Sequence, residues 1–197
     1  MEKRFKINSI ITEYKLENFD DSIYSEELEK VASNIQEVIV PNKIVISTEA
    51  TKIIFDHIDW SKDTHQNSVE QGGLLIGHSY MDENNKIIVG YVEKAIPALM
   101  AKGSMTYLEL NHDVWKSMMD TLDEINENAK NRELQIIGWY HTHPGRLSVY
   151  ISGTDLNTQQ KMFANDWQFA IVLNPQKQIW RAFNGTDAKE CKGYILK

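Results

Sequence analysis

Two histidines lie two positions apart, directly after a run of β-forming residues at positions 136–140. Side chains alternate between the faces of a strand, so the imidazoles of His141 and His143 are expected on the same face. Pro144 follows at once, and because proline cannot continue a strand ladder, it predicts a strand end just past the pair. Two imidazoles fixed side by side at a strand end can share a metal ion, which needs a further ligand from elsewhere.

The further ligand expected from the sequence is Asp155. Residues 152–155 read Ser-Gly-Thr-Asp and precede a helical pattern of apolar residues. This spacing predicts a capping box, with Ser152 as the N-cap and Asp155 three residues later. The same helix start can also hold the carboxylate close to a metal ion. Two imidazoles and one carboxylate form a three-ligand zinc set with a fourth position open to water, which is typical of catalytic sites.

The stretch from position 141 to 155 resembles the JAMM motif of the MPN (JAB1/MPN/Mov34) metalloproteases, which is H-x-H-P, a short spacer and S-x-x-D. The segment that begins at Glu70, EQGGLLIG, is similar to the same family's E-x-x-G-x-L-x-G segment. The resemblance covers about residues 38–183 and implies the chemistry of a metallopeptidase.

The resemblance implies one Zn²⁺ ion per chain, bound by His141, His143 and Asp155. Zinc lowers the pKa of water from 15.7 to about 7, which supplies a nucleophile at neutral pH. Glu70 is expected to act as the general base and then as the general acid of amide hydrolysis. Ser152 is expected to donate a hydrogen bond to the oxyanion of the tetrahedral intermediate.

The resemblance also implies an α/β (α+β) fold, with an MPN-like curved and mostly antiparallel sheet flanked by helices. The apolar patterns predict a central strand over 136–140, helices that start near 47, near 111–113 and at 152, and an edge strand over 190–196. One catalytic domain is expected over residues 38–197. Residues 1–37 form an N-terminal extension, in which the apolar residues of 25–36 are spaced as in a short amphipathic helix.

Active members of this family cleave after the C-terminal glycines of ubiquitin or ubiquitin-like proteins, which makes such a modifier and its conjugates the implied partners. The connection 96–105 matches the position of the family's first insertion, which helps to hold the modifier's tail. The second insertion of linkage-specific eukaryotic deubiquitinases is missing, so the chain looks more like the prokaryotic JAB proteases. Some of these act in bacterial antiphage conjugation systems, beside E1- and E2-like proteins.

Three alternatives stay open at this point. One is the processing of sulfur-carrier ubiquitin-like proteins, and another is a non-catalytic MPN scaffold that binds partners without hydrolysis. The third is a RadC-like DNA-associated protein, because that family shares H-x-H-P and S-x-x-D. The spacer over 145–151 is apolar just before Ser152, as in the peptidase branch, and disfavours the third alternative.

Composition narrows the class of partner. The 197 residues are 42% hydrophobic and 25% charged, which is ordinary for a globular domain. A net charge of -7 argues against a nucleic-acid partner, since phosphate binding needs clustered Lys and Arg. No apolar run approaches the roughly 20 residues of a membrane span, and no signal-peptide core is expected. The single cysteine, Cys191, suits the reducing cytoplasm.

Overall fold

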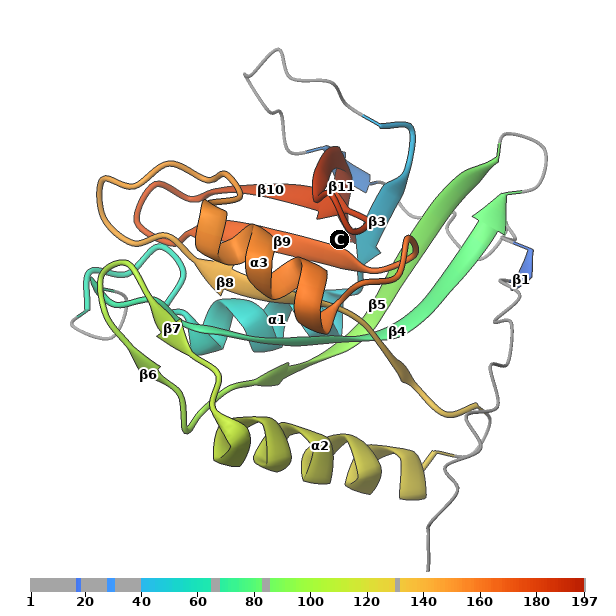
Figure 1. Cartoon of the computed structure of the whole chain (residues 1–197), viewed down its shortest axis with the longest axis horizontal. Helices are drawn as coiled ribbons and strands as arrows, with labels where there is room; N and C mark the ends of the chain where they lie inside the picture. Colours follow the sequence, from blue (N-terminus) through green and yellow to red (C-terminus); the bar gives the residue numbers. More distant parts are fainter. Residues whose placement is uncertain are drawn as a thin grey trace, which may run out of the picture.

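The computed structural model describes residues 17–18, 28–30, 40–64, 68–82, 86–129 and 132–196, which form a large sheet and helices packed against it (Figure 1). The helices are α1 Thr48–His57, α2 His112–Glu127 and α3 Gly153–Met162. The strands are β1 Glu17–Asn18, β2 Leu28–Lys30, β3 Lys43–Ile46, β4 Gly72–Asp82, β5 Ile87–Pro97, β6 Lys102–Gly103, β7 Leu108–Glu109, β8 Gln135–Thr142, β9 Phe169–Asn174, β10 Ile179–Asn184 and β11 Lys189–Leu196.

The large sheet closes on itself. Its strands follow the order β4-β5-β3-β11-β10-β9-β8, and β8 then pairs back with β4. Register shifts in β4, after Leu75 toward β8 and after Ile76 toward β5, mark irregularities of the kind that bend a strand. Pairs β3–β5, β3–β11, β8–β9 and β1–β4 are parallel, and the others are antiparallel. The expected fold class is confirmed.

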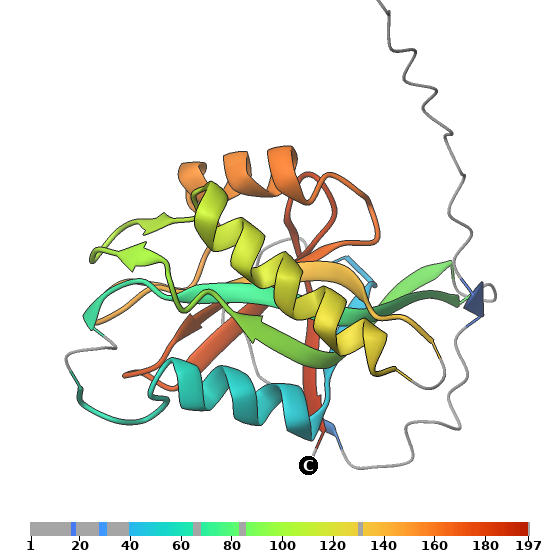
Figure 2. The ribbon, with the colours of Figure 1, turned by 90° about the horizontal axis from the view of Figure 1, so that it is seen from below.

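The helices cover both faces of this sheet because side chains alternate along its strands. Leu75 of β4 packs in one core with Ile54 of α1, whereas its neighbours Leu74 and Ile76 pack in a second core with Met118 of α2. Helix α1 therefore lies on one face, and α2 and α3 lie on the other (Figure 2). None of the helices in the described residues combines the length and the apolar content needed to cross a lipid bilayer.

The same alternation decides where the histidines point. On β8, Tyr140 packs in the core of α1, and Trp139 packs in the core of α2 with Phe163, the C-cap of α3. His141 is two residues past Trp139, so its side chain leaves the sheet on the face that α3 covers. The fold thus brings the strand end and the start of α3 together.

Two expectations about the ends of the chain are wrong where the structure describes them. Residues 190–196 do not form an edge strand, because β11 pairs with β10, β3 and β2 and lies inside the closed sheet. Leu28–Lys30 belong to strand β2, not to a helix over 25–36, because they pair with the Tyr194–Leu196 end of β11. The rest of 25–36 lies outside the described residues. Long-range pairing here overrides the local apolar spacing.

Candidate functional site

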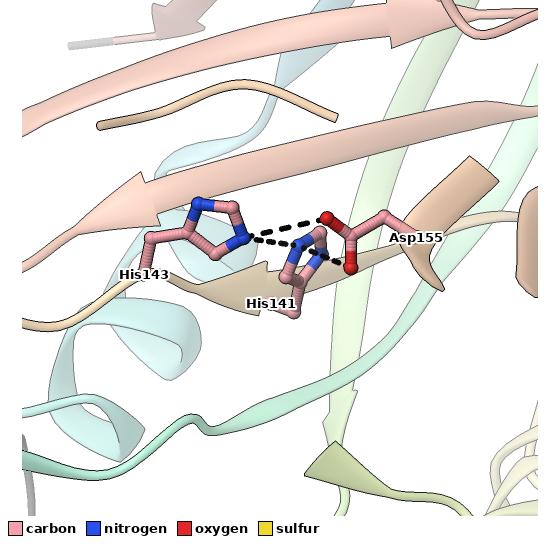
Figure 3. A group of neighbouring side chains, drawn as sticks. All are labelled: His141, His143 and Asp155. Carbon is pink, nitrogen blue, oxygen red and sulfur yellow. Dashed lines mark hydrogen bonds and ion pairs between the residues drawn. The ribbon is translucent and has the colours of Figure 1, made fainter. Parts of the chain in front are cut away.

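Three candidate metal ligands meet where β8 ends and α3 begins (Figure 3). The Nε2 atoms of His141 and His143 are 3.3 Å apart. The Asp155 carboxylate faces both, with its oxygens 3.2 Å from Nε2 of His141 and 3.4 Å from Nε2 of His143. All three residues are buried, and the ligand atoms lie within 4.8 Å of one another. Two strand-end imidazoles and one helix-start carboxylate therefore converge on one point.

The start of α3 fixes the carboxylate of Asp155. Ser152 is the N-cap, and its hydroxyl oxygen accepts a hydrogen bond from the Asp155 backbone N–H at 3.2 Å. In return, the Ser152 backbone N–H donates to Oδ2 of Asp155 at 2.7 Å. This is the capping box that the spacing predicts, and it leaves Oδ1 of Asp155 facing His141. One motif thus begins the helix and aims an acidic group at the two histidines.

The two imidazoles are oriented in different ways. Nδ1 of His143 lies 2.7 Å from the backbone carbonyl oxygen of Ser148, to which it donates, so Nε2 faces Asp155. Nδ1 of His141 is buried without a hydrogen-bond partner among the described residues. The His141 ring instead stacks on Trp139, with centroids 4.4 Å apart and planes 13° from parallel. Packing replaces the usual hydrogen bond in orienting this ring.

The charges at the site favour an ionised Asp155. Burial alone would raise the pKa of this carboxyl, but the contacts with His141 and His143 outweigh it and hold the pKa well below its usual range. Burial lowers the pKa of His141, which keeps that ring neutral and able to bind a metal. Burial also opposes the cationic form of His143, but Asp155 and the Ser148 carbonyl outweigh it and raise the pKa of His143. A metal ion binding there would displace that proton.

Glu70 lies beside these residues because its segment is tied to β8. The Thr142 hydroxyl oxygen accepts a hydrogen bond from the Gln71 N–H at 2.9 Å, and the Thr142 N–H donates to the Gln71 carbonyl at 2.8 Å. Gly72 then pairs with His141, and a Cβ at Gly72 would lie 2.5 Å from the Tyr140 carbonyl oxygen. Only glycine allows this close approach of the two strands.

The Glu70 side chain lines a cavity of about 130 Å³ together with His141 and Asp155, two of the three expected ligands. Glu70 is only 7% exposed to solvent. Burial, with a further contribution from the Asp155 charge, raises the pKa of the Glu70 carboxyl to about 7, although the His143 charge opposes the shift. A carboxyl with this pKa can both accept and release a proton near neutrality. Ser152 is half-buried and adjoins Asp155, but its side chain is not among those lining this cavity.

Three supporting contacts have no local signal in the sequence. Gln159 of α3 accepts a hydrogen bond from Nε1 of Trp139 at 2.7 Å, which fixes the indole that stacks on His141. The Ser148 carbonyl orients His143, and the Asn174 side chain donates to the His143 carbonyl oxygen at 2.6 Å. Each contact joins residues from different elements, or uses a backbone atom, so residue type and spacing could not reveal it.

Comparisons with known proteins agree with this geometry. The family model described as "JAB1/Mov34/MPN/PAD-1 ubiquitin protease" matches residues 40–166. The COP9 signalosome complex subunit 5 of Kluyveromyces lactis is 29% identical over 138 residues, which are 70% of this chain and 32% of that protein. The 26S proteasome regulatory subunit RPN11 of Candida glabrata is 29% identical over 113 residues, which are 56% of this chain and 33% of that protein.

A third relative has a name of a different kind. The NAD(+) hydrolase TcpA of a Theionarchaea archaeon is 27% identical over 124 residues, which are 62% of this chain and 31% of that protein. The chain thus spans about a third of the length of each of these three relatives. The likeness concerns about a third of each relative, and the family match over 40–166 contains Glu70, His141, His143, Ser152 and Asp155 but not Asn174.

Proposed function

The chain belongs to the JAB1/Mov34/MPN/PAD-1 ubiquitin protease family, and we propose that it is a zinc-dependent peptidase or isopeptidase that cleaves after the C-terminal glycine of a ubiquitin-like modifier. One observation carries the proposal: two imidazoles and a carboxylate converge on one point beside a cavity that Glu70 also lines. Family membership supports the reaction class. The identity of the substrate and the identity of the metal are proposals that go beyond family membership.

The donor set fits zinc. Four ligands placed tetrahedrally about zinc at roughly 2.0–2.1 Å lie about 3.3 Å from one another. The 3.3 Å between the two Nε2 atoms matches that spacing, and each Nε2 atom has a different Asp155 oxygen at 3.2 or 3.4 Å. Two imidazole nitrogens and one carboxylate are also the ligand types that catalytic zinc takes. His141, His143 and Asp155 would therefore hold the ion and leave one position open.

Bound zinc would supply Lewis acidity, which polarises the scissile carbonyl and makes water a stronger nucleophile near neutral pH. Glu70 takes the proton that the attacking water loses and returns it to the leaving amine, which its pKa of about 7 allows. The hydroxyl oxygen of Ser152 accepts a hydrogen bond from the Asp155 backbone N–H, which leaves the hydroxyl hydrogen available for the oxyanion. A general base of this kind contributes roughly 10²–10⁴-fold to the rate.

The surroundings of the cavity support an extended protein tail as substrate. Tyr107, Leu108 and Met162 line it, and Tyr107 and Met162 are also exposed to solvent. An extended tail ending in glycine is slender enough to lie beside the short β6–β7 pair, whereas a folded domain is not. We place the reaction in the cytoplasm and include conjugates of the modifier, with E1- and E2-like proteins, among the partners. The setting we propose is a bacterial ubiquitin-like conjugation system of the antiphage kind.

The test of this proposal joins metal content with cleavage. Purified protein should carry about one zinc ion per chain, and Asp155→Ala and His141→Ala should lose it. Glu70→Gln should keep both zinc and fold but lose hydrolysis, because it removes only the proton carrier. Matched fusions of ubiquitin-like proteins to a lysine or a short peptide should be cut after the terminal glycine, as located by mass spectrometry, and a chelator should stop the cut.

Two outcomes would contradict the proposal. Zinc content near zero in carefully purified, folded protein would favour a non-catalytic scaffold. Equal cutting of unstructured peptides at many sites would leave a metallopeptidase but remove the modifier from the substrate claim.

A further inference from the structure

The loop that connects the metal-ligand histidines to α3 is held by the β9–β10 hairpin. Figure 1 shows this loop beside the β9–β10 turn. Side chains of the hairpin donate hydrogen bonds to backbone carbonyls of the loop. His143 begins the loop, and its backbone N–H donates to the Leu173 carbonyl at 2.8 Å, one residue beyond the last β8–β9 pair. From that point the loop leaves the sheet, and side chains of the hairpin take over its support.

The centre of that support is Asn174, the last residue of β9, which is fully buried. Its side-chain NH₂ group lies 2.6 Å from the His143 carbonyl oxygen and 3.0 Å from those of Gly145 and Leu147. Its Oδ1 accepts a hydrogen bond from the Lys177 N–H at 2.9 Å. Because that N–H can only donate, the atom facing it must be the oxygen, and the nitrogen must face the three carbonyls.

These contacts determine the path of the loop. Carbonyl oxygens at positions 143, 145 and 147 point to one amide group, so the loop curls around the Asn174 side chain. A backbone bond from the Leu147 N–H to the Pro144 carbonyl, at 3.3 Å, closes the same turn. The next residue is Ser148, whose carbonyl oxygen is the one that orients His143 at 2.7 Å. Asn174 therefore binds the Leu147 carbonyl, which is one peptide unit before the Ser148 carbonyl that orients the His143 imidazole.

Two further residues of the hairpin act on the same loop from farther along. The exposed Lys177 ammonium donates to the Arg146 and Leu147 carbonyls at 2.8 and 2.9 Å. The buried Arg181, paired with Glu190, donates to the Val149 carbonyl at 3.0 Å. The loop carbonyls from 143 to 149 are thus largely taken by side chains of β9, β10 and the turn between them.

We propose that Asn174 is a positioning residue for the metal centre, which sets the direction of the His143 imidazole by fixing the 144–148 loop. The inference rests on the zinc site proposed above. It adds a residue from β9, outside the motif that carries the ligands, and it makes the hairpin a part of the site. Supporting groups of this kind typically change metal affinity 10–100-fold when they are removed.

The experiment measures zinc affinity, by competition with a chelator, in Asn174→Ala and in a matched control. The control is Asn184→Ala at the other end of the same hairpin, where a buried side-chain NH₂ donates to the Asp166 and Gln168 carbonyls at 3.0 and 3.1 Å. Both substitutions remove side-chain hydrogen bonds to backbone carbonyls, so both should lower the melting temperature. Only Asn174→Ala should raise the dissociation constant for zinc, by about 10–100-fold. It should also change the visible absorption of the cobalt(II)-loaded protein.

A dissociation constant in Asn174→Ala within about threefold of the wild-type value, or an equal rise in both variants, would overturn the inference. If Asn174→Ala does not fold, Lys177→Met provides the test, because this exposed residue keeps its aliphatic stem and loses only its donors. It should weaken zinc binding several-fold, while Lys189→Met, at an exposed lysine that begins β11, should not; equal binding in both would overturn the inference. These readouts need no turnover, so a wild-type protein that binds zinc but cleaves nothing would contradict the proposed function and leave this inference standing.

Discussion

The Glu70 carboxyl is placed where ionisation is costly. Burial and the nearby Asp155 charge both oppose its negative charge, and together they raise its pKa to about 7 against the opposing His143 charge. In the unfolded chain the same group has a pKa near 4.5. Between these two values the folded protein keeps a proton that the unfolded chain releases, so stability falls as pH rises through this window. The proposed general base thus has a pKa near neutrality at a cost in the stability of the folded protein.

We therefore predict that Glu70→Gln stabilises the metal-free protein at pH 8 more than at pH 5. At pH 8 the native carboxyl is largely ionised inside the site, and the neutral amide removes that penalty. At pH 5 the native carboxyl is already protonated, so the substitution changes less. The expected gain in melting temperature at pH 8 is roughly 2–6 °C, because about 1 kcal/mol shifts a domain of this size by roughly 2–4 °C. Thermal melts in a chelator at both pH values measure it.

The control for this prediction is Glu124→Gln, which changes an exposed carboxylate of α2. It should shift the melting temperature little at either pH. An equal shift for Glu70→Gln at pH 5 and pH 8 would mean that the carboxyl is not desolvated in the folded protein and that its pKa is not raised.

At the scale of single elements, Ser152 at the start of α3 combines two roles, one in stability and one in the proposed reaction. The Ser152 hydroxyl caps the helix through the Asp155 N–H and, as proposed, donates to the oxyanion. Ser152→Ala should therefore cost about 1 kcal/mol of stability. It should also reduce the hydrolysis rate, by roughly 10²–10³-fold if the hydroxyl supports the oxyanion. A thermal melt beside an activity assay separates the two effects.

Ser47 offers a matched control because it caps α1 in the same way, with its hydroxyl oxygen accepting from the Ala50 N–H at 3.0 Å. Ser47→Ala should lower the melting temperature at least as much, since its hydroxyl also donates to the Glu93 carbonyl at 2.7 Å. It should leave the rate unchanged. If Ser152→Ala melts lower but hydrolyses normally, the hydroxyl is a cap alone and the oxyanion support must come from another group.

The elements also show what local sequence can and cannot predict. A helix start near position 47, the Ser152 cap and the pair His141 and His143 were predictable, because each depends on residues within a few positions. Strand β2 was not, because Leu28–Lys30 take their conformation from pairing with β11. The roles of Gln159 and Asn174 were hidden for the same reason: their partners lie 20 or more positions away in sequence. Long-range contacts are where a single sequence, read by pattern, carries least information.

At the scale of the whole molecule, closure of the sheet brings the parts of the site together. Strand β8 lies between β4 and β9 because the sheet returns on itself, so Glu70 before β4 and Asn174 at the end of β9 flank the same strand end. Helix α3 then packs over that end through the second core. The residues of the site therefore come from separate segments of the chain, at the ends of β4, β8 and β9 and at the start of α3.

The last prediction concerns the apolar surface beside this assembly. Within the described residues, Leu99, Met100, Met105 and Tyr107 are exposed large apolar side chains in and around the β6–β7 pair. The pair is joined to the Glu70 segment, because the Glu70 N–H donates to the Ser104 carbonyl at 2.6 Å. Exposed apolar side chains next to a cavity of this kind indicate a contact surface for a protein partner.

Replacing Met105 and Tyr107 by serine should therefore raise KM for a ubiquitin-like fusion by about 5–30-fold, since two such apolar contacts at an interface together contribute roughly 1–2 kcal/mol. The value of kcat and the zinc content should change little, because neither side chain is a proposed ligand or proton carrier. Ile179→Ser, at an apolar residue of β10 that is 39% exposed, is the control and should leave KM unchanged. Steady-state kinetics on one fusion substrate would decide the matter. Were kcat to fall while KM stayed constant, the β6–β7 pair would be acting on Glu70 through their shared hydrogen bond, and the modifier would have to bind on another face of the molecule.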